Sequence, residues 1–237
     1  FFPDAAVAAV EQMSRLPHVV IDGVYTHFCT SEIEDDECTK KQLELFEKVS
    51  RRLAARGVRP PRIHAANSGA ILNYPQSLLT LVRPGLILYG VYPDVRLRQK
   101  IRLRPVLQFE TDIVFLKEIP AGATLGYGRT YVAKAERKIA TANVGYADGY
   151  PWRLSNKAAV LVRGQRAPVA GRVSMDQLLI DVTDVPGVRL GDTVVLLGRN
   201  DPEQLTAENL AEWADTIPYE ILCGISKRVP RVYTGER

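Results

Sequence analysis

In the first half of the chain, the side chains best suited to chemistry stand in three short clusters of polar residues and glycines. The clusters are Thr26-His27-Phe28, residues 64–70 and residues 82–90. Each lies at the end of a strand-like segment, the edge where ligands bind in parallel α/β sheets and barrels. Ser68 stands at a predicted helix start, where free backbone N–H groups can hold a phosphate. Each cluster is also typical of an ordinary loop, so no single cluster decides the function.

In the second half, the corresponding feature is tyrosines among glycines. Tyr127 is the centre of a Gly-Tyr-Gly run, and Tyr146 lies in a Gly-Tyr-Ala-Asp-Gly run. A phenol between glycines stands clear of neighbouring side chains and can be presented to a substrate, although Tyr-Gly turns are also common structural features. A third predicted turn begins at a glycine and contains both Arg172 and Met175. A methionine there is equally suited to filling a gap in the core.

The elements that must position the first three clusters alternate between helix and strand. Apolar residues at helical spacing predict helices over residues 4–15 and 36–57 and a helical turn over 68–72. Runs rich in β-branched and aromatic residues predict strands over 18–21, 24–28, 62–66 and 80–83. This alternation indicates βα units with parallel strands, in an open sheet or a closed barrel.

After about residue 100 the pattern becomes β-rich. Strands are predicted over residues 106–119, 138–144, 158–162, 177–182 and 192–197. Gly164-Gln165 predicts a tight hairpin, and residues 206–215 are the one segment here with a helical pattern. The polar, basic stretch 94–104 marks a boundary, so we expect one domain over residues 1–100 and a second over 101–237.

Composition and charge exclude several classes of protein. Of the 237 residues, 46% are hydrophobic and 24% are charged, which is typical of a globular protein and not of a disordered one. The net charge of +4 is spread along the chain without a basic stripe carrying aromatics, so nucleic acid is not an expected partner. No apolar run reaches the roughly 18 residues of a membrane span. The three cysteines lack zinc-site spacing, so we expect no metal and a reduced, cytoplasmic protein.

Taken together, the motifs resemble the alanine racemase family in order and approximate spacing. They are His27, Asn67-Ser68, Arg83-Pro84-Gly85, Tyr89-Gly90, Gly126-Tyr127-Gly128, the run 145–149, Arg172, Met175-Asp176 and Ile217-Pro218-Tyr219-Glu220. The resemblance covers essentially the whole chain. It implies an α/β plus β fold: the C-terminal part of a (β/α)8 (TIM) barrel, followed by a mainly β domain. The implied function is racemisation of alanine with pyridoxal 5'-phosphate (PLP), which supplies D-alanine as a peptidoglycan precursor.

The resemblance implies that the first half binds PLP. Arg83 faces the pyridine nitrogen of the cofactor, and His27 lies against the ring. Because a guanidinium can only donate hydrogen bonds, that nitrogen stays an unprotonated acceptor. The phosphate and the lining of the site are assigned to Ser68, to the backbone amides of Gly85 and Leu86, and to Asn67.

Racemisation requires a base on each face of the substrate's α-carbon. The resemblance assigns one base to Tyr127, which acts in the opposite subunit of a head-to-tail homodimer. A phenol needs cationic or hydrogen-bonding neighbours to act as a base near neutral pH, and His27 with Arg83 is suited to supply them. The backbone of Met175 is assigned to the substrate carboxylate. The corridor through which substrate enters is assigned to Glu32, Tyr146, Arg153 and Arg172.

The chain departs from the family pattern in two places. The family's second base is the lysine that holds the cofactor; it lies in the earlier part of the barrel, and no lysine here matches it. The chain begins Phe1-Phe2-Pro3 without methionine. We therefore expect a portion that lacks the early barrel and is inactive alone. In addition, Lys227 stands where the family has a phosphate-binding tyrosine, and an ammonium can still neutralise a phosphate.

Two other functions remain open from the sequence. One is a racemase that prefers serine, and the other is a non-catalytic binding or dimerisation module. The decarboxylases that combine a barrel with a β domain on the same cofactor are disfavoured by the Gly-Tyr-Gly run 126–128 and by the run 145–149.

Overall fold

The computed structural model describes residues 1–235, which form two compact units. Unit 1 is Phe1–Arg104, and unit 2 begins at Pro105. The predicted boundary at residue 100 lies inside unit 1. Within residues 1–235, no helix combines the length and the apolar composition needed to cross a membrane.

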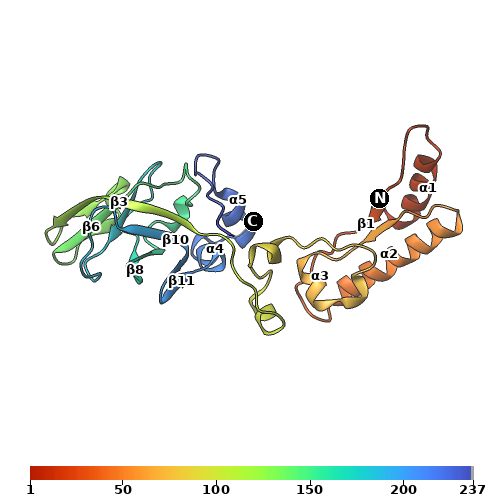
Figure 1. The fold of residues 1–237 in the computed structure, drawn as a ribbon, viewed down its shortest axis with the longest axis horizontal. Coiled ribbons are helices and arrows are strands. Elements are labelled where there is room, and N and C mark those ends of the chain that lie inside the picture. The colour runs from red at the N-terminus through yellow and green to blue at the C-terminus, as the bar shows by residue number, and fades with distance from the viewer. Residues whose placement is uncertain (236–237) are drawn as a thin grey trace. The chain divides into compact units, whose positions relative to one another are not determined.

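Unit 1 contains three α-helices and a pair of parallel strands (Figure 1). The α-helices are α1 (Pro3–Ser14), α2 (Glu37–Ala55) and α3 (Ser68–Asn73). Strand β1 (Gly23–Tyr25) pairs in parallel with β2 (Arg62–His64). The 3-10 helices are η1 (Pro75–Ser77), η2 (Leu86–Tyr89) and η3 (Val95–Gln99). The predicted alternation of helix and parallel strand is therefore confirmed for β1, α2, β2 and α3.

Helix α2 shows why the prediction over residues 36–57 was accurate. The Asp36 side chain caps the helix by accepting a hydrogen bond from the Thr39 N–H, as an N-cap residue does. Leu43, Phe46 and Leu53 recur at helical spacing and are all buried. Leu43 and Phe46 pack in one core cluster with Phe28, Ala65, Ala66, Ala70 and Tyr74.

Two predicted strands of unit 1 are not formed. His18 has a φ of 65°, which breaks the extended backbone predicted for residues 18–21. Residues 80–83 lie beside β2, where the Thr80 N–H donates to Ile63 O and the Arg83 N–H donates to Ala66 O. Pro84, which follows, has no N–H with which to extend a ladder. The prediction of β structure in both segments was wrong because it weighed side-chain type alone.

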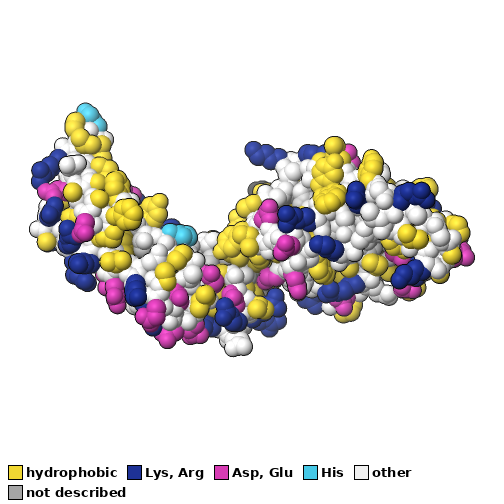
Figure 2. All heavy atoms as spheres, turned by 180° about the vertical axis from the view of Figure 1, so that it is seen from behind, with side chains coloured by type: hydrophobic (Ala, Val, Ile, Leu, Met, Phe, Trp, Pro, Cys, Tyr) yellow, Lys and Arg dark blue, Asp and Glu magenta, His cyan; other side chains and the backbone are white. Residues whose placement is uncertain are grey.

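Unit 1 exposes several large apolar side chains. Figure 2 shows hydrophobic side chains gathered over the visible face of this unit. The most exposed ones in unit 1 include Phe1, Phe2, Val20 and Tyr25. Extended apolar exposure of this kind marks surfaces that proteins bury against other segments or chains.

Unit 2 is built on a seven-stranded antiparallel sheet. The order is β8-β7-β10-β3-β6-β9, and β11 also pairs with β10. The strands are β3 (Phe109–Ile119), β6 (Arg137–Ala142), β7 (Ala159–Val162), β8 (Gln165–Pro168), β9 (Leu178–Asp181), β10 (Thr193–Asn200) and β11 (Glu203–Leu205). A separate two-stranded ladder joins β4 (Thr124–Leu125) to β5 (Tyr131–Val132). The short helix η4 (Tyr127–Arg129) follows β4, and the short helix η5 (Trp152–Leu154) precedes β7. The central position of β10 explains its unbroken apolar run, because both of its faces are covered.

The turns and helices of unit 2 follow local chemistry. The β7–β8 hairpin turns at Arg163 and Gly164, both with positive φ, which is the two-residue geometry that suits twisted strands. Thr206 forms a capping box at the start of α4 (Ala207–Ala214), which confirms the helix predicted over residues 206–215. Helix α5 (Pro218–Gly224) was not predicted, because its seven residues are too few to establish a period.

Candidate active site

Arg83 is the centre of a hydrogen-bonded cluster in unit 1. Its guanidinium donates from Nη1 to Nδ1 of His64 at 2.6 Å. Nη2 donates to the backbone oxygens of Thr26 at 2.9 Å and of Ala65 at 3.1 Å, and lies 3.4 Å from Nδ1 of His27. These partners lie within or just after β1 and β2. The two parallel strands therefore fix the orientation of the guanidinium.

An aromatic stack supports the same guanidinium. The rings of Tyr25 and His64 lie 5.3 Å apart with 14° between their planes, and the Arg83 Cζ lies 5.4 Å from the centre of the Tyr25 ring. Burial lowers the pKa of Arg83, and burial together with the charge of Arg83 lowers the pKa of His64. Since a guanidinium can only donate, His64 must accept through an unprotonated Nδ1.

His64 was missed as a site residue, although it opens the second polar cluster. Its position could have indicated a role, because His64 ends β2 at the sheet edge where Arg83 was expected to lie.

The His64–Arg83 contact predicts an acid-sensitive contribution to stability. A histidine whose folded pKa is lowered stays neutral in the folded state while the unfolded chain already binds a proton. Its contribution is therefore complete above the unfolded pKa of about 6.5 and is lost as pH falls through the lower folded value. Urea unfolding across this pH range should show a smaller acid-dependent loss in His64→Gln than in the unsubstituted protein. Equal losses in the two proteins would contradict the assignment.

Ser68, Gly85 and Asn67 form a small polar cluster at the start of α3. The Gly85 N–H donates to Oγ of the buried Ser68 at 2.9 Å. The Asn67 side chain caps α3 by accepting from the Ala70 N–H, and it also accepts from Oγ of Ser31 at 2.6 Å. The Ser68 hydroxyl can rotate to donate to an anion, and an anion could replace Ser68 Oγ as the acceptor of the Gly85 N–H. This donor set suits a phosphate oxygen.

Backbone packing holds this polar cluster in place. A Cβ added to Gly69 would lie 2.8 Å from the Glu32 nitrogen and 2.9 Å from the Ser31 carbonyl carbon. The segment after β1 therefore packs directly against the first turn of α3. A residue larger than glycine at position 69 would push the two apart. Through this contact, Glu32 lies beside the same helix start as Ser68.

In unit 2, Tyr127 projects from a loop that is built on Arg172. Tyr127 is 73% exposed, and both flanking glycines have positive φ. A Cβ on Gly126 would lie 3.2 Å from the Arg172 nitrogen, and one on Gly128 would lie 3.1 Å from its Nη1. Both positions thus require glycine, because their φ is positive and because Arg172 lies too close for a side chain. The loop presents the phenol with little around it.

The loops of Tyr146 and Met175 bond to each other. The Tyr146 N–H donates to Ser174 O and the Ala147 N–H donates to Met175 O, both at 3.0 Å. A Cβ on Gly145 would overlap these same two carbonyl oxygens. Glycine at 145 therefore allows two predicted site residues to lie side by side.

Gly145→Ala is expected to destabilise the protein by about 2 kcal/mol or more, because the added methyl cannot fit without moving the loop of Met175. Gly224→Ala is the matched control, since a Cβ there meets nothing closer than 3.8 Å and should cost less than about 0.5 kcal/mol. Chemical denaturation of both variants measures the difference. Similar stabilities would contradict the packing described here.

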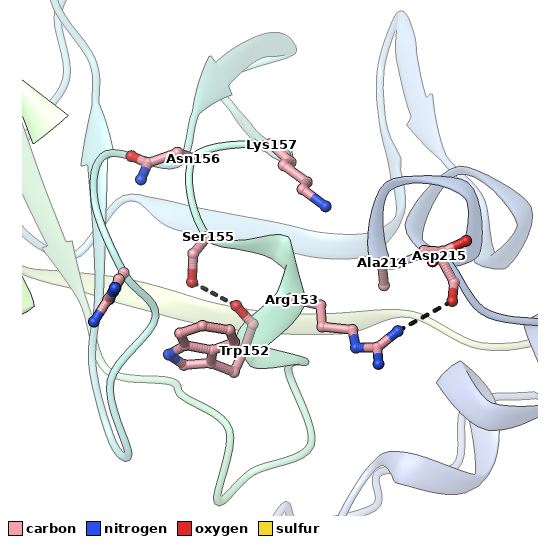
Figure 3. Close-up of a pocket in the computed structure, with 8 residues that line it drawn as sticks. Trp152, Arg153, Ser155, Asn156, Lys157, Ala214 and Asp215 are labelled. Atoms are coloured by element: carbon pink, nitrogen blue, oxygen red, sulfur yellow. Dashed lines mark hydrogen bonds between the residues drawn. The ribbon is translucent and has the colours of Figure 1, made fainter. Parts of the chain in front are cut away.

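A cationic pocket of about 440 Å3 lies in unit 2 (Figure 3). It is lined by Trp152, Arg153, Ser155, Asn156, Lys157, Arg172, Ala214 and Asp215. The Arg172 Cζ lies 5.6 Å from the centre of the Trp152 ring, and Arg153 Nη1 donates to Asp215 O at 3.4 Å. Three cations against one carboxylate make the pocket attractive to anions.

Comparison with known proteins matches both units to one family. Residues 1–93 match the family model for the alanine racemase N-terminal domain, and residues 106–233 match that for the alanine racemase C-terminal domain. The chain belongs to the alanine racemase family. Its fold is that of the family, with a barrel domain followed by a C-terminal β domain.

Alanine racemases of several bacteria resemble the chain over almost its whole length. The alanine racemase of Halothermothrix orenii is 48% identical over 234 residues, covering 99% of this chain and 62% of that protein. Alanine racemase 2 of Caldanaerobacter subterraneus subsp. tengcongensis is 45% identical over 97% of this chain and 59% of that protein. The chain thus spans about three-fifths of the length of these relatives.

Solved alanine racemase structures agree with the fold. The enzyme of Streptomyces coelicolor A3(2) has a TM-score of 0.91 at 34% identity, over 99% of this chain and 61% of that one. The enzyme of Clostridium difficile 630, in complex with cycloserine, has a TM-score of 0.89 at 34% identity, over 96% of this chain and 60% of that one.

One prediction needs correction. The chain was expected to lack the early barrel of the alanine racemase family and to be inactive for that reason. The match of residues 1–93 to the family's N-terminal domain contradicts the absence of the early barrel, and the expected inactivity has no support. The prediction relied on one unmatched lysine and on the first residues of the chain.

Within each unit, the structure brings several of the predicted residues together. In unit 1, His27 lies beside Arg83, and Ser68, which follows the capping residue Asn67, accepts from the Gly85 N–H. In unit 2, Arg172 lies under the loop of Tyr127, and it shares the cationic pocket with Arg153. Lys227 is exposed and follows Ser226, whose N–H donates to Asp148 O in the loop of Tyr146.

Proposed function

We propose that the protein racemises L-alanine and D-alanine with PLP by a two-base mechanism. The observation that carries the proposal is the Arg83 guanidinium, which both parallel strands hold beside His27. The bonded pair Ser68 and Gly85 follows the chain order of the family. Exposed Tyr127 in its glycine loop supports the second half of the mechanism. We assign unit 1 to the barrel domain and unit 2 to the β domain.

The residues of unit 1 fit PLP by the chemistry of their donors. A guanidinium has five N–H donors, and the contacts described above use only Nη1 and Nη2, so Arg83 can donate to one further acceptor. A pyridine nitrogen without a proton is such an acceptor. The Ser68 hydroxyl, the Gly85 and Leu86 amides and the Asn67 side chain suit the phosphate end, and the Lys227 ammonium is assigned to the same phosphate.

When bound, PLP withdraws electrons from the α-carbon of an attached amino acid, which makes the α-proton acidic enough to transfer. Arg83 limits this withdrawal, because a donor at the ring nitrogen keeps that nitrogen unprotonated. By keeping this withdrawal modest, the Arg83 guanidinium would favour return of the proton over side reactions. His27 positions the ring and connects Arg83 to the tyrosine side of the site.

Tyr127 exchanges a proton between its phenolic oxygen and one face of the α-carbon. The opposite face requires a second base, which in the family is the cofactor lysine. We assign no lysine of this chain to that role. The Met175 backbone binds the substrate carboxylate, and Glu32, Tyr146, Arg153 and Arg172 line the corridor of entry. The positive charge of the cationic pocket supports this route for a carboxylate substrate.

We further propose a head-to-tail homodimer in which Tyr127 serves the opposite subunit, and a cytoplasmic role in supplying D-alanine for peptidoglycan. No metal is required by this mechanism. Among the described residues, no three His, Cys, Asp or Glu side chains gather closely enough to hold a metal ion.

The test is a racemisation assay on alanine and on serine, with PLP added to the purified protein. We expect faster racemisation of alanine than of serine, together with visible absorption from bound PLP. Reduction with borohydride followed by peptide mapping would show whether a lysine of this chain holds the cofactor. Preference for serine would overturn the substrate, and absence of PLP binding at any concentration would favour a non-catalytic binding or dimerisation module.

A further inference from the structure

The sulfur atoms of Cys29 and Cys38 lie 3.7 Å apart. Cys29 follows the buried Phe28 in the segment after β1, and Cys38 lies in the first turn of α2. Both thiols are free and exposed. A disulfide needs a sulfur–sulfur distance of about 2.05 Å, and rotation of two exposed side chains can supply the remaining approach.

Tertiary hydrogen bonds bring the two cysteines together. The Asp36 side chain accepts from Oγ1 of Thr30 at 2.6 Å and from the Thr39 N–H at 2.8 Å. Tyr74 Oη accepts from the Asp36 N–H at 2.8 Å and donates to Ile33 O at 2.6 Å. The segment between the cysteines is therefore folded back onto α2, and the pair is held close before any bond forms.

Neighbouring groups also affect the Cys38 thiol and the position of Cys29. Contact with the Cys29 sulfur is the main cause that raises the pKa of the Cys38 thiol. The Gln42 amide oxygen lies 3.5 Å from the Cys29 sulfur and accepts from the Cys29 N–H at 3.3 Å, which holds Cys29 against α2. Cys223 has no comparable neighbour in these contacts and belongs to unit 2.

We propose that Cys29 and Cys38 form a reversible disulfide when the protein meets hydrogen peroxide. One thiolate attacks a peroxide oxygen; the O–O bond breaks, hydroxide leaves and the sulfur becomes a sulfenic acid. The second thiolate attacks that sulfur; the S–S bond forms, the S–O bond breaks and hydroxide leaves. Two thiols have then lost two electrons and two protons, and the peroxide has become two molecules of water.

The pair lies next to the candidate active site. Cys29 is two residues beyond His27, and the intervening Phe28 accepts through its backbone oxygen from the Asn67 side chain at 3.5 Å. The disulfide would tie this segment covalently to α2. This inference rests on the cysteine geometry and not on the proposed function.

The test treats the purified protein with one equivalent of hydrogen peroxide, blocks remaining thiols with an alkylating agent and cleaves after glutamate. Glu32, Glu34 and Glu37 lie between the two cysteines, so only a disulfide keeps the resulting peptides joined. We expect the joined peptides in the unsubstituted protein and in Cys223→Ser. We expect none after treatment with dithiothreitol, nor in Cys29→Ser or Cys38→Ser.

Oxidation of the chain unfolded in guanidinium chloride is the second comparison. Because the native fold holds the thiols together, formation of the bond should be about tenfold faster, or more, in the native protein. The proposal is overturned if both cysteines of the native protein are alkylated after peroxide. It is also overturned if Cys29 or Cys38 is joined to Cys223 instead, or if the native and unfolded rates are equal.

Discussion

Tyr127→Phe is expected to racemise alanine about 10³-fold more slowly than the unsubstituted protein, because the substitution removes the only atom that can carry the proton at this position. The change should leave the fold intact, since the side chain is 73% exposed and its loop is set by Gly126, Gly128 and Arg172. The loss of rate therefore reports on proton transfer and not on stability.

The diagnostic measurement is exchange of the α-proton with deuterated water, made separately for each alanine enantiomer. One enantiomer should lose exchange almost completely, while the other should retain it through the base on the opposite face. Tyr233→Phe is the matched control, because Tyr233 is 92% exposed near the end of the chain. Equal loss for both enantiomers, or no loss for either, would remove Tyr127 from the role of base.

Arg83→Glu is expected to lower racemisation by about 10²-fold or more and to change the visible spectrum of the bound cofactor during turnover. A carboxylate accepts hydrogen bonds, so the PLP ring nitrogen beside it would take up a proton and withdraw electrons more strongly. The substitution also removes the donor that serves Thr26 O, Ala65 O and His64 Nδ1. Thermal unfolding must therefore be measured with the spectrum.

Arg83→Lys separates the two effects. An ammonium keeps a positively charged donor but lacks the planar fork that reaches both strands at once. This variant should lose stability as Arg83→Glu does, yet keep the spectrum of the unsubstituted protein. An unchanged spectrum in Arg83→Glu, with a racemisation rate within about twofold of normal, would place Arg83 outside the site.

Several elements that the sequence predicted correctly have local causes. Helix α2 has an N-cap aspartate and an apolar stripe, helix α4 has a capping box, and the β7–β8 hairpin has a glycine where φ is positive. Each cause acts within a few residues and is therefore visible in one sequence. Helix α5 and the irregular segments 18–21 and 80–83 lack such a local signal.

The sequence by itself also determined the identity of the motifs, because a resemblance depends on residue types in order along the chain. His27, Arg83, Ser68 and Tyr127 were named in this way, and the family was confirmed by comparison of both domains. The sequence did not determine which of these side chains touch. The inference that the early barrel was absent also came from the sequence, and the match of residues 1–93 to the N-terminal domain contradicts it.

Only the tertiary structure decided the contacts between distant residues. It revealed that His64 accepts from Arg83, that Gly145 lies against the carbonyl oxygens of Ser174 and Met175, and that Cys29 meets Cys38. The physical reason is the range of the interactions. Caps, turns and apolar stripes depend on residues that are close in the sequence. The contacts between distant residues depend on how parallel strands and loops pack, and the local spacing of residue types does not predict that packing.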